Sequence, residues 1–268
     1  MSFSRKRERQ FFLNFMLLIS DLTNLGFMMK KAFFICGVVF FSPLLYASFH
    51  DWKPLVALNI GPQWDDPGET SQFSVEPATP KTYAAISNPQ TLMGAEFFVG
   101  GQHTLNTWSD LQLGIAVAMT SLTSLSGDIW EDADPDFNNY TYAYKLAPFR
   151  ATLSAKWLVK TFDVVTPYLN VGLGLSFNRS YSYSIMPKIF EEVPSPLYTS
   201  NVPVSFAYDV GLGLQRQLGE HIQVGLGYVF SDWGQSSLGR APKQTTNSPL
   251  SLSHLYMNQC VVSLSYFI

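Results

Sequence analysis

The chain has 268 residues, of which 47% are apolar and 15% aromatic, with 17 basic and 20 acidic side chains. Residues 1–47 hold six of the basic and two of the acidic residues, so residues 48–268 keep 11 basic and 18 acidic side chains and a net charge of −7. This balance argues against a protein whose overall charge attracts nucleic acid or anionic lipid. Residues 48–268 contain one cysteine, Cys260, and therefore form no internal disulfide.

The N-terminal part has the features of a cleaved targeting segment. Residues 28–31 are Met-Met-Lys-Lys, residues 32–41 are apolar, and Ala47 is a small residue suited to cleavage before Ser48. The apolar run is shorter than the roughly 20 residues of a spanning helix. We expect a signal peptide over 28–47 within a leader of residues 1–47. The first 27 residues repeat the basic-then-apolar pattern and indicate a start codon assigned too early, with an inner-membrane anchor as the alternative.

Beyond the leader, eight segments alternate between apolar and small or polar residues. In the fifth segment every odd position from Leu169 to Phe177 is apolar, whereas the even positions are Asn, Gly and Ser. A period of two residues predicts a β-strand with two unlike faces. Pro148 indicates a bulge in the fourth segment. The predicted strands are 53–64, 91–102, 108–120, 139–158, 166–178, 202–217, 221–232 and 256–268.

The chemistry of the two faces favours a membrane-spanning barrel. Each apolar stripe covers about ten residues, which at ~3.3 Å per residue and ~45° tilt spans roughly 23 Å, close to the apolar band of an outer-membrane barrel. A soluble barrel has its large apolar groups inside. Here the other face is rich in glycine and small polar residues, which leave room in a narrow lumen. Aromatic residues near strand ends fit two interfacial girdles: Trp108, Trp157, Tyr168, Tyr266 and Phe267 at one end, and Tyr142, Phe177, Tyr228, Phe230 and Trp233 at the other.

The connections alternate in length in step with strand parity. Long external loops and short periplasmic turns are typical of outer-membrane barrels. We therefore predict an all-β fold, an eight-stranded antiparallel up-and-down transmembrane β-barrel over residues 48–268. The long connections are 65–90, 121–138, 179–201 and 233–255, and the short ones are 103–107, 159–165 and 218–220.

The C-terminal strand and one internal segment carry a family resemblance. Residues 260–268 alternate and end in aromatic residues, similar to the C-terminal signature that the barrel assembly machinery reads, although Phe267 is penultimate here. The chain resembles the small eight-stranded outer-membrane barrels of the opacity-protein-like and OmpA-membrane-domain-like group. Residues 228–242 and 252–256 look like a segment of gammaproteobacterial outer-membrane proteins. The resemblance implies fold and location and brings no catalytic residues.

Candidate chemistry is sparse. The histidines His50, His103, His221 and His254 have no metal-binding spacing, so we expect neither a metal nor a cofactor. Ser251, Ser253 and His254 raise the possibility of a serine hydrolase, but no GxSxG motif accompanies them. A surface histidine is the alternative for His254, and we expect no enzyme.

Five charged residues fall on the inward parity of their strands. A charge inside a narrow barrel is costly unless an opposite charge lies beside it. We expect some of the five to form an ion-pair network that closes the lumen, with Arg150 between Glu96 and Asp209, whereas Asp110 and Lys156 fit the watery periplasmic rim. The candidates are Glu96, Asp110, Arg150, Lys156 and Asp209.

Three functions fit this pattern. The first is a structural or surface-interaction barrel of a Gram-negative outer membrane, the second is a narrow porin, and the third is a lipid-modifying barrel enzyme. Eight strands leave little lumen and disfavour a wide pore. The expected partners are outer-membrane lipid and lipopolysaccharide, the barrel assembly machinery, and host or surface ligands at the loops. No nucleic acid is expected.

Overall fold

The computed structural model describes residues 51–65, 68–76, 79–160, 164–189, 197–242, 244 and 249–268. Residues Trp52–Ile268 form one compact unit. The leader predicted over residues 1–47 lies outside the described residues. No helix in the described ranges is long and apolar enough to cross a membrane.

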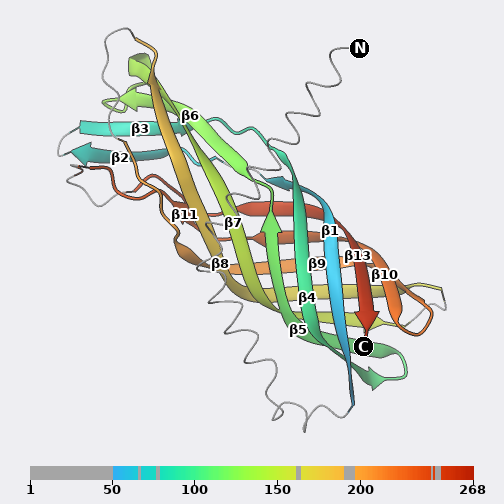
Figure 1. The fold of residues 1–268 in the computed structure, drawn as a ribbon. Coiled ribbons are helices and arrows are strands. Elements are labelled where there is room, and N and C mark those ends of the chain that lie inside the picture. Colours follow the sequence, from blue (N-terminus) through green and yellow to red (C-terminus); the bar gives the residue numbers. More distant parts are fainter. Residues whose placement is uncertain are drawn as a thin grey trace, which may run out of the picture. The chain divides into compact units, whose positions relative to one another are not determined.

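Eight antiparallel strands close into a ring (Figure 1). Each strand pairs with the next along the ring, and the closing ladder joins the first strand to the last, from Leu55 opposite Phe267 to Asp65 opposite Met257. The predicted fold class and all eight predicted strands are confirmed. The ring strands are β1 (Trp52–Asp65), β4 (Thr91–Asn106), β5 (Ser109–Thr120), β7 (Asn138–Val159), β8 (Thr166–Pro187), β9 (Val204–Leu218), β10 (Ile222–Asp232) and β13 (Tyr256–Phe267).

The two faces of the wall have opposite chemistry. Outward aliphatic side chains are strongly exposed, for example Leu153 at 67%, Leu212 at 61% and Leu173 at 54%. Inward polar side chains on the same three strands are buried, including Asn170 and Asp209. The ring therefore presents an apolar belt outside and a polar lumen inside, as the alternation predicted. This is the arrangement that a barrel in lipid needs.

The two ends of the barrel differ. Short turns join β4 to β5, β7 to β8 and β9 to β10 at one end, called here the short-turn end. At this end the aromatic C-terminus turns inward: Phe267 packs with Leu55 and Phe98 inside the wall. The opposite end, where the other connections run, is called the long-loop end.

Much of the long-loop end is regular structure where the sequence predicted loops. β2 (Ser71–Glu76), β3 (Thr79–Ala85) and β6 (Thr123–Glu131) continue the sheet beyond the barrel, in the order β2-β3-β6-β7 (Figure 1). β8 runs on to Pro187 and stays paired with β7. The outer sheet consists of β2, β3 and β6 together with the parts of β7 and β8 that extend beyond the ring. A 3-10 turn, η2 (Pro135–Phe137), joins β6 to β7, and β11 (Ser236–Ser237) pairs with β12 (Ser251–Leu252).

The predicted bulge at Pro148 is wrong. Pro148 lies in regular register opposite Asn178. The irregularity falls higher, where Ala143 pairs with Ser184 but Lys145 pairs with Tyr181, so β8 has one extra residue. Ser182 adopts a left-handed conformation there, with φ of 55°. An extra residue at a bulge changes which face the next side chains occupy.

The outer sheet and the loops of the long-loop end share an apolar core. The Tyr83 and Tyr198 hydroxyls lie 3.0 Å apart, and Tyr83 stacks on Phe73 at 5.0 Å between ring centroids. Burial raises the pKa of the Tyr83 hydroxyl, so it stays neutral. The residues of this core come from strands and loops that cover one another, which removes their side chains from water. Its buried members include Leu125, Ile129, Tyr142, Tyr144, Leu146, Trp233, Leu238, Leu250, Leu252, Leu255 and Met257.

The apolar belt predicts that the cost of an outward charge depends on its depth in the membrane. Leu173→Arg places a guanidinium near the middle of the apolar face and should cost about 2–4 kcal/mol of folded-state stability in lipid. Leu218→Arg is the matched control at the short-turn rim, where the expected cost is about 0–1 kcal/mol. Both losses of stability can be measured by urea unfolding of the protein in vesicles, with heat-dependent migration on gels as the readout of the folded fraction. Equal losses at the two depths would contradict this orientation of the belt.

Candidate functional site: the lumen of the barrel

Arg150 is the centre of the lumen. Its Nη2 donates to Glu96 Oε2 at 2.8 Å, and its Nη1 lies 3.2 Å from Asp209 Oδ2. The three residues come from β7, β4 and β9, and the Arg150 and Asp209 side chains are almost fully buried. The guanidinium therefore connects strands that are not neighbours in the ring. Removing one partner from such a buried group leaves an uncompensated charge.

An indole ring covers this ion-pair centre from the long-loop end. The Arg150 guanidinium lies 5.0 Å from the centre of the Trp233 ring, and Trp233 is 2% exposed. The wall holds Trp233 in place: Asn178 Nδ2 and Ser176 Oγ both donate to its carbonyl oxygen, and its own Nε1 donates to Ser231 Oγ at 2.8 Å. A cation on an indole face is attracted by the ring quadrupole. Trp233 thus joins the polar lumen to the apolar core above it.

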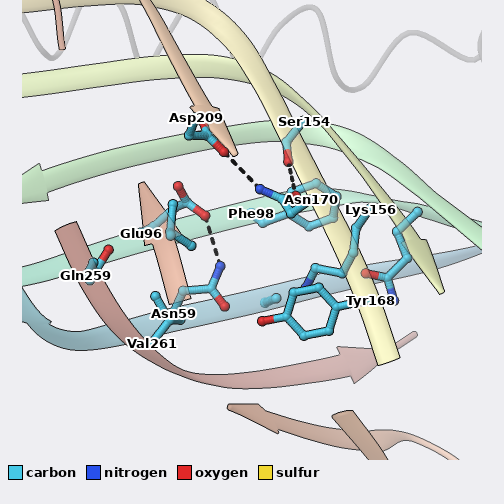
Figure 2. A pocket seen from close by; sticks show the side chains of 13 residues that line it. Asn59, Glu96, Phe98, Ser154, Lys156, Tyr168, Asn170, Asp209, Gln259 and Val261 are labelled. Atoms are coloured by element: carbon cyan, nitrogen blue, oxygen red, sulfur yellow. Dashed lines mark hydrogen bonds between the residues drawn. The ribbon is translucent and has the colours of Figure 1, made fainter. Parts of the chain in front are cut away.

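A small cavity in the lumen is lined in part by Glu96 and Asp209, the two partners of Arg150 (Figure 2). Its volume is about 30 Å³, enough for roughly two water molecules. Asn59 donates to Glu96 at 2.9 Å, and Asn170 donates to Asp209 at 2.8 Å while accepting from Ser154 at 2.9 Å. These bonds orient the two carboxylates toward Arg150. The cavity belongs to the same network as the ion-pair centre.

Lys156 lies on the other side of the cavity, beside Tyr168 (Figure 2). Its ammonium nitrogen is 4.7 Å from the centre of the Tyr168 ring. Among the described residues no carboxylate comes within 4 Å of it. The ring face and the cavity therefore surround this cation, and Lys156 stands apart from the ion pairs of Arg150.

A ladder of amides closes the short-turn end. Asp110 pairs with Lys160 at 2.6 Å and accepts from Gln102 at 2.9 Å. Gln112 continues the chain, donating to Gln102 Oε1 at 2.9 Å and to Gln223 Oε1 at 3.3 Å. Gln112 is on β5 and Gln223 on β10, which are four strands apart in the ring. The last bond consequently crosses the whole lumen.

Glycines provide the space for these groups. A Cβ on Gly172 would lie 2.2 Å from the Asp209 carboxylate, and one on Gly227 would lie 2.2 Å from the Tyr168 hydroxyl. Such contacts are too close for any side chain. The inward glycines thus leave room for an ion-paired carboxylate and for an aromatic ring.

The five predicted lumen residues separate into two groups. Arg150, Glu96 and Asp209 come together, whereas Asp110 pairs with Lys160 and Lys156 packs on Tyr168. Sequence reasoning missed the amide ladder and the inward position of several aromatic residues. The inward parity of Gln102, Gln112 and Gln223 was a usable signal for the amide ladder. Tyr168, Tyr142, Phe267 and Trp233 had been placed in the girdles, but all four are buried inside.

The serine and histidine at the long-loop end have separate acidic partners. His254 Nδ1 lies 2.8 Å from Asp232 Oδ2, and Ser253 Oγ donates to Glu69 Oε1 at 3.0 Å. In the part of the chain that is described, no hydrogen bond joins Ser253 to His254. No serine–histidine pair is therefore formed there to activate a nucleophile. The described residues also contain no group of three or more metal-ligating side chains placed to hold an ion.

Among the known proteins that are similar to this chain are solved outer-membrane barrels. Neither a protein-family model nor a curated protein matches the chain. Neisserial surface protein A is 13% identical with a TM-score of 0.40, covering 80% of this chain and 97% of its own. OprG of Pseudomonas aeruginosa is 12% identical with a TM-score of 0.43, covering 81% and 98%. The outer membrane protease OmpT of Escherichia coli is 9% identical with a TM-score of 0.43, covering 82% and 98%. At these values the likeness brings no function to this chain.

The ion-pair centre generates a second prediction. Arg150→Ala leaves Glu96 and Asp209 without their cation and should destabilise the folded barrel by about 3–5 kcal/mol. Adding Glu96→Gln and Asp209→Asn to Arg150→Ala should restore most of that loss, since no buried charge then lacks a partner. Urea unfolding midpoints of the three proteins test this. A single variant as stable as the triple variant would show that the charges are not coupled.

Proposed function

We propose that this chain is an outer-membrane β-barrel of a Gram-negative bacterium, with a structural or surface-interaction role rather than that of an open pore. The apolar belt supports the membrane location, because a ring with exposed leucines outside and buried Asn, Gln and Asp inside suits lipid and not water. With both termini of the ring at the short-turn end, that end faces the periplasm and the long-loop end faces outward.

The closure of the lumen is the observation that supports a non-conducting role. Three layers lie across it: the amide ladder from Asp110 to Gln223, the Arg150 ion-pair centre, and Trp233 with the apolar core above. The small cavity of about 30 Å³ lies between the first two. A hydrated ion would have to break buried ion pairs and displace an indole to pass.

The outer sheet is the part that would meet other molecules. Its core of buried tyrosines gives it a fixed shape, in contrast to long loops without secondary structure. Host or environmental surfaces are the partners proposed for it. The barrel assembly machinery is the partner proposed for the C-terminal strand β13, and outer-membrane lipid and lipopolysaccharide are those proposed for the belt.

Membrane insertion and conductance test the proposal together. Urea-washed outer membranes should retain the protein, and an unboiled sample should migrate differently from a boiled one. In planar bilayers, the folded protein should conduct no more than the bilayer alone. The double variant Arg150→Ala, Trp233→Ala removes two closing groups and should give a small conductance.

Each alternative has its own signature in these measurements. Discrete open levels from the unmodified protein would support the narrow porin and contradict closure. A change in the mass of lipid A on expression of the unmodified protein, with no change on expression of the His254→Ala variant, would support a lipid-modifying enzyme. Recovery of the protein in the soluble periplasm would contradict the barrel's membrane location.

A further inference from the structure

Two cations lie side by side on the outer wall of β7 and β8. Lys145 faces outward from β7, in the same alternation as Phe149, and Arg179 faces outward from β8, two residues above Phe177. Lys145 pairs in register with Tyr181, and Ala147 with Arg179, so the two cations are diagonal neighbours on one face. Phe149 and Phe177 stand directly below them, with ring centroids 6.1 Å apart.

Tyr181 is a neighbour of both cations on this face. The Arg179 guanidinium lies 4.9 Å from the centre of the Tyr181 ring, and Lys145 is the residue directly opposite Tyr181 on the neighbouring strand. Arg179 therefore points up the wall, away from the apolar belt. A ring face that holds a guanidinium leaves the guanidinium edge free to bind a planar or tetrahedral anion.

No carboxylate neutralises this pair among the described residues. The ion pairs of the described residues include neither Lys145 nor Arg179, so each described carboxylate lies more than 4 Å from both cations. Other cations of the long-loop end do have acidic partners: Lys81 pairs with Glu131 at 2.7 Å, and Lys188 with Asp128 at 2.8 Å. Although residues 48–268 are acidic overall, this part of the wall is locally positive.

The height of the pair matches the edge of the lipid. Trp157 and Leu169 mark the lower end of the apolar stripe on β7 and β8, and both are exposed. At ~3.3 Å per residue and ~45° tilt, Arg179 stands roughly 23 Å and Lys145 roughly 28 Å above them. The apolar band of an outer-membrane barrel is roughly 25 Å tall. Both cations thus fall at the level where lipid headgroups begin.

We propose that Lys145, Arg179 and Tyr181 bind the phosphate of a phosphorylated lipid in the outer leaflet. This rests on the proposed outer-membrane location, and it assigns one lipid contact to named residues. Arg179 binds the phosphate through its guanidinium edge, Lys145 adds a second charge, and Phe149 and Phe177 contact the acyl chains below. A freely diffusing phosphate lacks the acyl chains, so the site is one for lipid.

Binding of a defined lipid to the refolded full chain in zwitterionic detergent tests the site. The probe is lipid A with two phosphates, compared with dephosphorylated lipid A and with inorganic phosphate. The double variant Lys145→Gln, Arg179→Gln removes both charges but keeps a polar side chain at each position, and it should bind the phosphorylated lipid about 25-fold more weakly, roughly fivefold for each cation. Arg216→Gln, an exposed outward cation at the short-turn end, is the matched control and should bind as the unmodified protein does.

The outcomes distinguish failure of the phosphate-site proposal from failure of the proposed function. Heat-dependent migration and retention in urea-washed membranes first establish that each variant is a folded, inserted barrel. A barrel that is inserted but binds both lipid forms equally, or whose double variant binds as tightly as the unmodified protein, overturns the phosphate site alone. Failure of the unmodified chain to insert overturns the proposed function and the site with it. Binding of inorganic phosphate as tight as that of lipid A would overturn the lipid assignment.

Discussion

Closure of the backbone ladder is the constraint on which the rest of the structure depends. In lipid no water is available to an unpaired N–H or C=O group, so the first and last strands must find each other, as β1 and β13 do. Closing only eight strands leaves a narrow interior. Side chains pointing inward from opposite strands consequently meet, and Gln112 reaches Gln223 across the ring. The polar network of the lumen follows from the size of the ring.

The narrow interior also explains why glycine, charge and aromatic residues occur together. Asp209 is held beside Arg150 only because the neighbouring strand has Gly172 at that level. Trp233 lies over the guanidinium because Ser176 and Asn178 bind its carbonyl oxygen. Because these groups are buried, the loss of one of them leaves a neighbouring polar group without its partner. The apolar core then keeps water from the upper side of the centre.

The sequence was most informative where one face meets lipid and the other a polar lumen. Period-two alternation follows directly from that contrast, so the eight strands and the inward orientation of Glu96, Arg150 and Asp209 were predictable from parity. The outer sheet was not, because Phe73, Tyr83 and Ile129 acquire their burial from packing between distant segments. Trp233 and Tyr168 were misplaced for a related reason: an aromatic residue near a strand end has the same sequence signal whether it faces lipid or turns inside.

The continuity of β7 and β8 has a mechanical consequence. Both strands run unbroken from the short-turn end into the outer sheet and stay paired from Leu158–Tyr168 to Tyr140–Pro187. A pull on the outer sheet acts along these strands and across their hydrogen bonds, which lie perpendicular to the strand direction. Many bonds then carry the load in parallel instead of opening one after another. The hairpin that displays the outer sheet is therefore also the element that ties it to the membrane against shear.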